Sequence, residues 1–527
     1  MKSSFASRAA VLLAVCLAGV TDVQPAHAGD ATRGAACLAA ADLGCARSAS
    51  TGLGSGSREG RFLADLAFHE QRFDDALRLL KASAGATPDA ETQSTLDLYK
   101  ATVEATAGFV RETRGDVSVL YLPGTDEVLL DDTFTTLQAA HDRLGPRLGK
   151  APPGGVRVEI YPTAQRFIEA SGIPAANVET TGVVALSKWS RLLVTSPRAL
   201  ARGYAWKDTI AHEYTHYIVS YNTADRAPVW LQEGIARSHE VLWRSDAFED
   251  LPAYQQSMLA TALARNTLVP LERMHPSMAF LPSADMAALA FAQVATMIQY
   301  LEHVAGPGAT QRVLVEVKGG TDALQAVGDV GAAGHSDAFV EGWKGWLRGL
   351  KLVSRALAAM PTVIGEADDV ATDPLLAGRQ DLAGFVRLGD LLLAASRPEA
   401  ALVEFKKAVP DEEPASPTLA VRLARAYRAL HRDPEASTVL QQTIADYPEY
   451  ATSRKELGAL LVSEGKSSAA IVQYLASADI NPFDPAVQEA LATLYIAAGN
   501  AEQAERRRRY ERILRLGGSS LPQGSSH

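Results

Sequence analysis

A regular repeat in the C-terminal part of the chain limits its fold more than any other feature. Four small residues recur there with a period of about 34 residues, and an alanine follows each of them after twelve positions. The pairs are Gly389 with Ala401, Ala424 with Ala436, Gly458 with Ala470, and Ala492 with Ala504. Small residues at this spacing let two helices cross closely, and each helix pair then buries one face on the next. The pattern therefore predicts a stack of helical hairpins.

This period is that of tetratricopeptide (TPR) repeats. Pro448 and Pro482 are separated by the same interval and end successive units, and we expect the array to occupy residues 381–516. Arg506–Arg509 falls in the last helix, where a solvated cap is a more common role than a recognition patch. TPR arrays bind peptides and proteins of many kinds, so the repeat predicts a protein partner without identifying it.

The same twelve-residue spacing occurs once near the N-terminus. Ala64 and Ala76 are twelve apart within residues 61–84, a segment with helical periodicity on both sides of a break at residues 71–73. We therefore expect one TPR-like helix pair in an N-terminal helical region, residues 29–114.

The second strong motif is HEYTH, His212–His216. Residues four apart lie on the same face of a helix because about 3.6 residues complete one turn, so His212 and His216 can bind a single metal ion. Glu213 is rotated by about 100° around the helix and can reach a water on the ion without ligating it. This position suits a general base.

An acidic residue a short distance downstream would complete the metal site. Glu233, in the segment PVWLQEGIA, is the candidate that follows His216 at such a distance. The polar residues 222–227 predict a turn, and Pro228 suits the first position of a second helix. Two imidazole nitrogens, one carboxylate and an open position for water describe a catalytic zinc site. We expect one zinc ion per chain, bound by His212, His216 and Glu233.

With these residues the chain resembles the gluzincin metallopeptidases, in particular the peptidase MA-like domains of bacteria, where a W-L-x-E-G-x-A segment follows HExxH. The resemblance covers residues 156–350. It implies that His212, His216 and Glu233 bind zinc, that Glu213 activates a water, and that peptide bonds are hydrolysed.

The rest of residues 115–350 predicts an α+β domain around this motif. We expect strands at 117–122, 128–130, 156–161, 182–186 and 192–196, and helices at 133–148, 163–171, 268–274 and 288–306; a helix at 96–113 ends the N-terminal region before them. In gluzincins an antiparallel edge strand lies over the zinc helix and pairs with an extended peptide. The strands directly before HEYTH fit that arrangement.

Two segments depart from related enzymes. Aminopeptidase-N-like gluzincins carry G-x-M-E-N on the edge strand to hold the substrate amine, whereas residues 182–186 read GVVAL, which favours an endopeptidase. Members of the resembling family often have A-Y-x-Q-S where residues 290–294 read AFAQV, so Phe291 lacks a hydroxyl that could stabilise an oxyanion. Tyr214, Tyr300 and His303 are alternative donors, although each is more typical of a core or surface position.

Residues 1–28 have the pattern of a secretory signal peptide, with Lys2 and Arg8 before an apolar run and AHA at the cleavage site. The apolar run is too short to span a bilayer, and we expect no transmembrane segment later in the chain. The interpretation is an exported bacterial protein, periplasmic or secreted. In such an oxidising compartment we expect Cys37 and Cys45 to form a disulfide.

The net charge of −10, with both signs interspersed, argues against nucleic acid and anionic membranes as partners. The predicted organisation is a signal peptide, a helical region, the peptidase domain, a connector, the TPR array and a disordered tail. Their ranges are 1–28, 29–114, 115–350, 351–380, 381–516 and 517–527.

The sequence thus predicts an α+β zincin-like peptidase domain flanked by all-α TPR-like repeats, acting as an exported zinc metallopeptidase on a peptide or protein substrate. Two alternatives stay open. One is a TPR scaffold that binds zinc but cleaves weakly or not at all, which Phe291 suggests. The other is a TPR adaptor in which HEYTH arises by chance.

Overall fold

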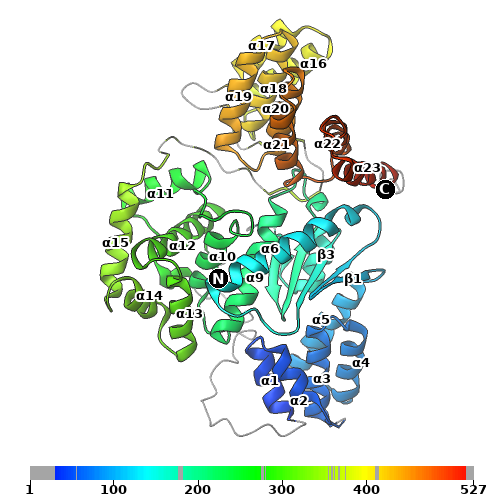
Figure 1. Ribbon diagram of the computed structural model, residues 1–527, viewed down its shortest axis with the longest axis vertical. Coiled ribbons are helices and arrows are strands. Elements are labelled where there is room, and N and C mark those ends of the chain that lie inside the picture. The colour runs from blue at the N-terminus through cyan, green and yellow to red at the C-terminus, as the bar shows by residue number, and fades with distance from the viewer. Residues whose placement is uncertain are drawn as a thin grey trace, which may run out of the picture.

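The computed structural model describes residues 30–517, apart from gaps at 55, 176–177, 179–181, 275–277, 279–280, 354, 356, 358–359, 361, 366–367, 374 and 410–414. The predicted signal peptide, residues 1–28, and residues 518–527 of the predicted tail lie outside the described part. Gly517 is the last residue of the final helix. In Figure 1 the chain forms three regions: N-terminal helices, a central part built around a sheet, and a C-terminal stack of helices.

The N-terminal region consists of short helices that pack on the sheet. They are α1 (Ala31–Ala39), α2 (Leu43–Ser50), α3 (Ser57–His69), α4 (Phe73–Ser83) and α5 (Ala90–Ala105). Helices α3 and α4 form the predicted pair, with Ala64 and Ala76 fully buried where they cross. Gln71 takes a left-handed backbone conformation in the turn between them, so the helical periodicity breaks there. Leu120 of the sheet joins the same apolar cluster.

The five strands form one mixed sheet in the order β1-β2-β3-β5-β4. They are β1 (Val110–Arg114), β2 (Val117–Tyr121), β3 (Val156–Tyr161), β4 (Ala185–Lys188) and β5 (Arg191–Thr195). The central strands β2, β3 and β5 run parallel, whereas β1 and β4 are antiparallel to their neighbours at the two edges. Every residue of β3 and β5 is buried, as expected for strands covered on both faces. Strand β4 is the edge next to the HEYTH helix.

Several predicted elements differ from the structure. The helix predicted at 96–113 ends at Ala105, and β1 follows, because the β-branched and charged residues after Gly108 pair with β2. The strand predicted at 128–130 is wrong: Thr125–Leu129 forms the 3-10 helix η1, which leads into α6 (Leu130–Leu148). The helix predicted at 268–274 reduces to the 3-10 turn η3 (Leu271–Met274), since Pro270 precedes it.

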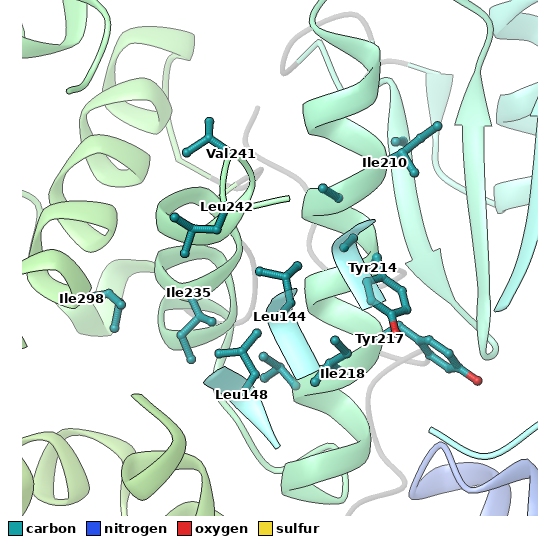
Figure 2. Close-up of a cluster of buried hydrophobic side chains, with 14 of the residues drawn as sticks. Leu144, Leu148, Ile210, Tyr214, Tyr217, Ile218, Ile235, Val241, Leu242 and Ile298 are labelled. Atoms are coloured by element: carbon teal, nitrogen blue, oxygen red, sulfur yellow. The ribbon is translucent and has the colours of Figure 1, made fainter. Parts of the chain in front are cut away.

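The main core lies where the HEYTH helix, α9 (Trp206–Thr223), packs between the sheet and the following helices. These are α10 (Val229–His239), α11 (Ala253–Arg265), α12 (Ala284–Ala305), α13 (Ala309–Gly319), α14 (Ala323–Gly331) and α15 (Ser336–Gly349); α7 (Ala164–Ser171) follows β3. Figure 2 shows Ile218 of α9 facing Leu144 and Leu148 of α6, with Ile235 of α10 and Ile298 of α12 beyond them. Helix α9 is thus held on several sides by apolar packing.

Four helix pairs form the C-terminal array. They are α16 (Gln380–Ala394) with α17 (Pro398–Lys407), α18 (Pro417–Ala429) with α19 (Asp433–Asp446), α20 (Ala451–Ser463) with α21 (Ser467–Ala478), and α22 (Pro485–Ala497) with α23 (Ala501–Gly517). The repeated small residues lie at the crossings. A Cβ at Gly389 would lie 2.3 Å from the Phe405 ring, so the first pair requires glycine there.

The array docks on the central region rather than standing apart from it. Arg506 and Arg509 of α23 pair with Asp132 and Asp131 of α6, and Tyr510 also donates to Asp131. The arginines predicted as a solvated cap are therefore partly docking residues. Between α21 and α22, the Ile480 carbonyl accepts a hydrogen bond from the Tyr204 N–H at 3.1 Å. Among the described residues, no helix is long and apolar enough to cross a membrane.

Burial of His239 in the last turn of α10 predicts a pH-dependent stability. Burial lowers the pKa of His239 to about 3 from 6.5, so the unfolded chain binds the proton more tightly than the folded chain. This contribution to stability is complete above pH 6.5 and is lost as the pH falls, at about 1.4 kcal/mol per pH unit. In His239→Asn, which keeps a donor for the Ile235 carbonyl, calorimetry should show a smaller drop in melting temperature between neutral and acidic pH. Parallel curves for the two proteins would contradict this assignment.

Candidate metal centre

Helices α9 and α10 bring three predicted ligands to one point. The Nε2 atoms of His212 and His216 lie 3.1 Å apart, and Glu233 Oε2 lies 3.4 Å from the first and 3.5 Å from the second. Within the described part of the chain, these residues form the one group of three or more His, Cys, Asp or Glu side chains with metal-binding geometry. The side chains are partly buried but remain accessible, with exposed fractions of 15%, 13% and 22%.

The spacing of these donor atoms suits a zinc ion. Ligand atoms about 2.0–2.1 Å from a tetrahedral zinc lie about 3.3 Å from each other, close to the observed triangle. The donor set of two imidazoles and one carboxylate is that of catalytic zinc sites, which keep a fourth position open. The three residues therefore fit the ion that the sequence predicts.

Gly234, the residue after Glu233 in α10, fixes the position of Glu233 by allowing α10 to approach α12 closely. A Cβ at Gly234 would lie 2.8 Å from the Val294 backbone oxygen of α12, so only glycine permits this helix contact. On α12, Gln293 anchors the preceding loop by exchanging two hydrogen bonds with the Val269 backbone, at 3.0 and 2.8 Å. Pro228 caps α10 instead of occupying its first turn, one position from the prediction.

A second carboxylate, which sequence reasoning missed, orients one of the histidines. His212 Nδ1 lies 3.0 Å from Glu240 Oε2, and the Arg237 guanidinium pairs with the other oxygen of Glu240. A carboxylate on the far nitrogen of a metal-binding imidazole fixes its tautomer and raises its basicity. The signal in the sequence was the spacing of Glu240, seven residues after Glu233 and hence on the same face of the helix.

Glu213 points from α9 toward the edge strand. Its side chain is buried, and its carboxylate accepts a hydrogen bond from the Ser187 N–H of β4. Tyr204 lies near enough to interact electrostatically with Glu213, but its hydroxyl donates to the Thr195 carbonyl. Glu213 thus lies between the metal-binding group and the sheet edge, and it is not part of the donor triangle.

The electrostatics of the group favour a bound cation. Burial acts to lower the pKa of His212, but the Glu233 and Glu240 carboxylates raise it to about 10. Burial acts to raise the pKa of Glu233, yet His216 and His212 hold it below its usual range. Burial raises the pKa of Glu213, and the two histidines only partly offset this effect. Positive charge is therefore stabilised between Glu233 and the histidines.

None of the alternative oxyanion donors reaches this group. The Tyr214 hydroxyl is 3.0 Å from His141 Nδ1 of α6, on the opposite side of α9. The rings of Tyr300 and His303 contact Trp346 near the far end of α12. Phe291 is half-buried and packs on the main core.

The N-terminal cysteines lie together, away from the donor triangle. Cys37 and Cys45 form a disulfide, and their Cα atoms are 5.6 Å apart. The bridge links α1 to α2, whose small apolar cluster also includes Phe62 and Leu66 of α3.

Comparison with known families identifies two parts of the chain. Residues 136–349 match the Peptidase MA superfamily, and residues 392–457 match a tetratricopeptide repeat. The chain therefore contains a Peptidase MA superfamily domain followed by TPR repeats. No curated protein matches the chain.

Three of the solved structures that are similar to this chain each cover about a quarter of it. A crystal structure of MamA is 21% identical, with a TM-score of 0.25, and covers 28% of this chain and 85% of its own. The first TPR of Spaghetti (RPAP3), bound to an HSP90 peptide, is 19% identical, with a TM-score of 0.22. The match covers 23% of this chain and 94% of that structure. YrrB, described as a TPR protein with an unusual peptide-binding site, is 18% identical, with a TM-score of 0.23. The match covers 28% of this chain and 78% of YrrB.

Glu240→Gln tests the role of the second carboxylate. The amide preserves size but holds the His212 imidazole less firmly and leaves Arg237 without a charged partner, so zinc affinity should fall about 10–100-fold. Competition with a chromophoric chelator measures the change. Glu272→Gln, on an exposed residue of η3, is the matched control and should bind zinc normally. Equal affinity in the two variants would exclude the positioning role.

Proposed function

We propose that this protein is an exported zinc metallopeptidase of the gluzincin type that hydrolyses internal peptide bonds. The donor triangle of His212, His216 and Glu233 carries the proposal, because its spacing and chemistry suit a catalytic zinc ion. The match of residues 136–349 to the Peptidase MA superfamily supports the same class of enzyme.

The residues around the triangle suit distinct tasks in hydrolysis. A bound zinc ion would polarise a water and the carbonyl of the scissile bond. Glu213, beside the ligands but outside the triangle, takes the proton from the attacking water and returns it to the leaving amine. The raised pKa of its buried carboxyl supports this work, since a base whose pKa is nearer to neutral also serves as an acid in the second step.

Edge strand β4 gives the substrate a place to bind. Its outer side is the end of the sheet, and Ser187 already links it to Glu213. An extended peptide pairing with β4 would form main-chain hydrogen bonds that align its carbonyl with the metal. Residues 182–186 offer no carboxylate for a substrate amine, which favours an endopeptidase.

The TPR array adds a protein-binding role. We propose that it recruits the substrate or a partner protein, as TPR units that bind peptides do. The signal-peptide pattern of residues 1–28 and the Cys37–Cys45 disulfide support export to the periplasm or beyond.

A zinc-binding scaffold without strong catalysis is the competing proposal. Phe291 supports it, because this side chain has no hydroxyl to stabilise an oxyanion. In this case the metal would hold α9 and α10 together while the array provides the function.

Export makes a prediction about the mature protein. Mass spectrometry of the exported chain should find an N-terminus near Gly29, because AHA precedes it, and no free thiol at Cys37 or Cys45. An intact Met1 after export would refute the cleavage, and two alkylatable cysteines in the oxidised protein would refute the bridge.

Two glutamate variants separate catalysis from metal binding. Glu213→Gln should keep near wild-type zinc content but lower peptide cleavage by about 10²–10⁴-fold, because it removes only the acid–base group. Glu233→Gln should instead lose zinc affinity, since a neutral amide is a poorer ligand than a carboxylate. Zinc is measured by mass spectrometry and cleavage on an unfolded protein library.

The reverse pattern, with zinc lost in Glu213→Gln and kept in Glu233→Gln, would show that the two roles are wrongly assigned. Zinc-loaded wild type that cleaves no more than Glu213→Gln on any substrate would favour the scaffold. Wild type that does not bind added zinc would favour a simple TPR adaptor.

A further inference from the structure

A cavity of about 570 Å³ lies between the peptidase domain and the TPR array. One wall comes from the start of α9, the end of α10 and the segment leading into α11. The other wall comes from the array, through the loop between α19 and α20 and the ends of nearby helices. The array residues on this wall are Ala445, Pro448, Glu449, Arg454, Ala476, Asp479 and Ile480. Figure 1 shows the array stacked above the central part, where these elements meet.

The cavity lining is strongly charged and has an excess of acid. Six carboxylates line it against four basic side chains, an excess of two negative charges. Most of them neutralise one another in pairs: Lys207 with Asp479, Arg237 with Glu240, and Arg244 with both Asp208 and Glu249. The remaining cation, Arg454, donates its Nε to the Pro448 carbonyl at 3.1 Å.

Among the described residues, two of the six cavity carboxylates, Asp250 and Glu449, have no ion-pair partner, and Glu449 is the one that the array contributes. Its side chain is exposed to the cavity, and among the described residues it has no hydrogen-bond or ion-pair partner. Desolvation by the neighbouring protein atoms raises the pKa of the Glu449 carboxyl; Arg237 lowers it, while Glu240 and Asp208 raise it further. Arg237 cannot neutralise Glu449 fully because its guanidinium is already paired with Glu240.

The cavity is within reach of a peptide bound at the proposed metal centre. Glu240 lines the cavity and contacts His212 Nδ1, the nitrogen that faces away from the donor triangle, so the Glu240 carboxylate and the His212 ring separate the two sites. Asp208 lines it from α9 four residues before His212, about 6 Å along the helix axis. An extended peptide advances about 3.3 Å per residue, so a residue two or three positions from the scissile bond spans this distance.

We infer that the TPR array supplies one wall of the substrate site, and that Glu449 binds a positively charged side chain of the peptide, lysine or arginine. The inference rests on the proposed peptidase function and adds a preference for basic substrates to it. Within the described part of the chain Glu449 has no cationic partner, so the peptide would supply it, and hydrogen bonds between charged groups are stronger than those between neutral groups. The contacts that dock the array keep Glu449 in a fixed position beside the catalytic region.

Binding tests this inference without requiring cleavage. Three end-blocked fluorescent heptapeptides are compared, with a central lysine, norleucine or glutamate in an alanine background that lets the peptide shift its register. They are titrated by anisotropy into the full-length, zinc-loaded Glu213→Gln chain, which keeps the peptides intact. The lysine peptide should bind about tenfold more tightly than norleucine, and the glutamate peptide should bind most weakly.

Adding Glu449→Gln should abolish the difference between lysine and norleucine. The matched control is Glu399→Gln, on an exposed residue of α17 outside the cavity, and it should preserve the difference. Glu449→Ala, which cannot form the bond at all, serves as the second variant if the first misfolds by circular dichroism. Equal binding of lysine and norleucine, or a preference that survives both Glu449 variants, would overturn the inference.

The cleavage of the same peptides by the zinc-loaded wild type separates this inference from the proposed function. A preference for lysine in binding without any cleavage would leave the Glu449 site standing and refute the peptidase. Cleavage that ignores the central residue, together with equal binding, would refute the Glu449 site and leave the peptidase standing.

Discussion

The candidate site depends on the close crossing of α10 and α12, because this contact sets the position of Glu233. Because Gly234 has no side chain, α10 can approach the Val294 carbonyl of α12. The carboxylate of the preceding residue, Glu233, then faces two histidines on α9. Three electron-rich atoms within 3.5 Å of each other are unfavourable unless positive charge lies between them. The surrounding apolar core holds the helices in place against that repulsion, since packed interiors resist small displacements.

Three carboxylates surround the histidines, and burial and neighbouring charges place each of them in a different electrostatic environment. Glu233 stays ionised between two imidazoles, Glu240 is paired with Arg237, and Glu213 lies buried beside the sheet edge with a raised pKa. These three environments suit the roles of metal ligand, orienting group and proton carrier that we propose for Glu233, Glu240 and Glu213. Arg237 extends this set toward the array, because it also acts on Glu449.

The sequence was most informative where one short pattern determines one local geometry. HEYTH places two imidazoles on one helix face wherever it forms a helix, and the C-terminal repeat requires stacked hairpins because its small residues must lie at crossings. The segment 125–130 was harder, since its apolar residues suit a strand and a tight helix equally. Glu240 and Glu449 could not be assigned from spacing alone. The first needs the side-chain rotamer of His212, and the second needs the docking of two regions that are far apart along the chain.

The short edge strand has a consequence for association between copies of the chain. A strand that leaves its backbone groups open for a peptide also offers them to the edge of another molecule. Strand β4 has only four residues, and it ends at the exposed Lys188, whose ammonium lies 4.2 Å from the centre of the Trp189 ring. A short edge strand that ends in a lysine disfavours pairing between the sheets of two molecules, because the second copy would bring its own Lys188 to the same edge. A peptide with no cation at the position that faces Lys188 meets no such obstacle, so the length and the last residue of β4 disfavour self-association without excluding a substrate.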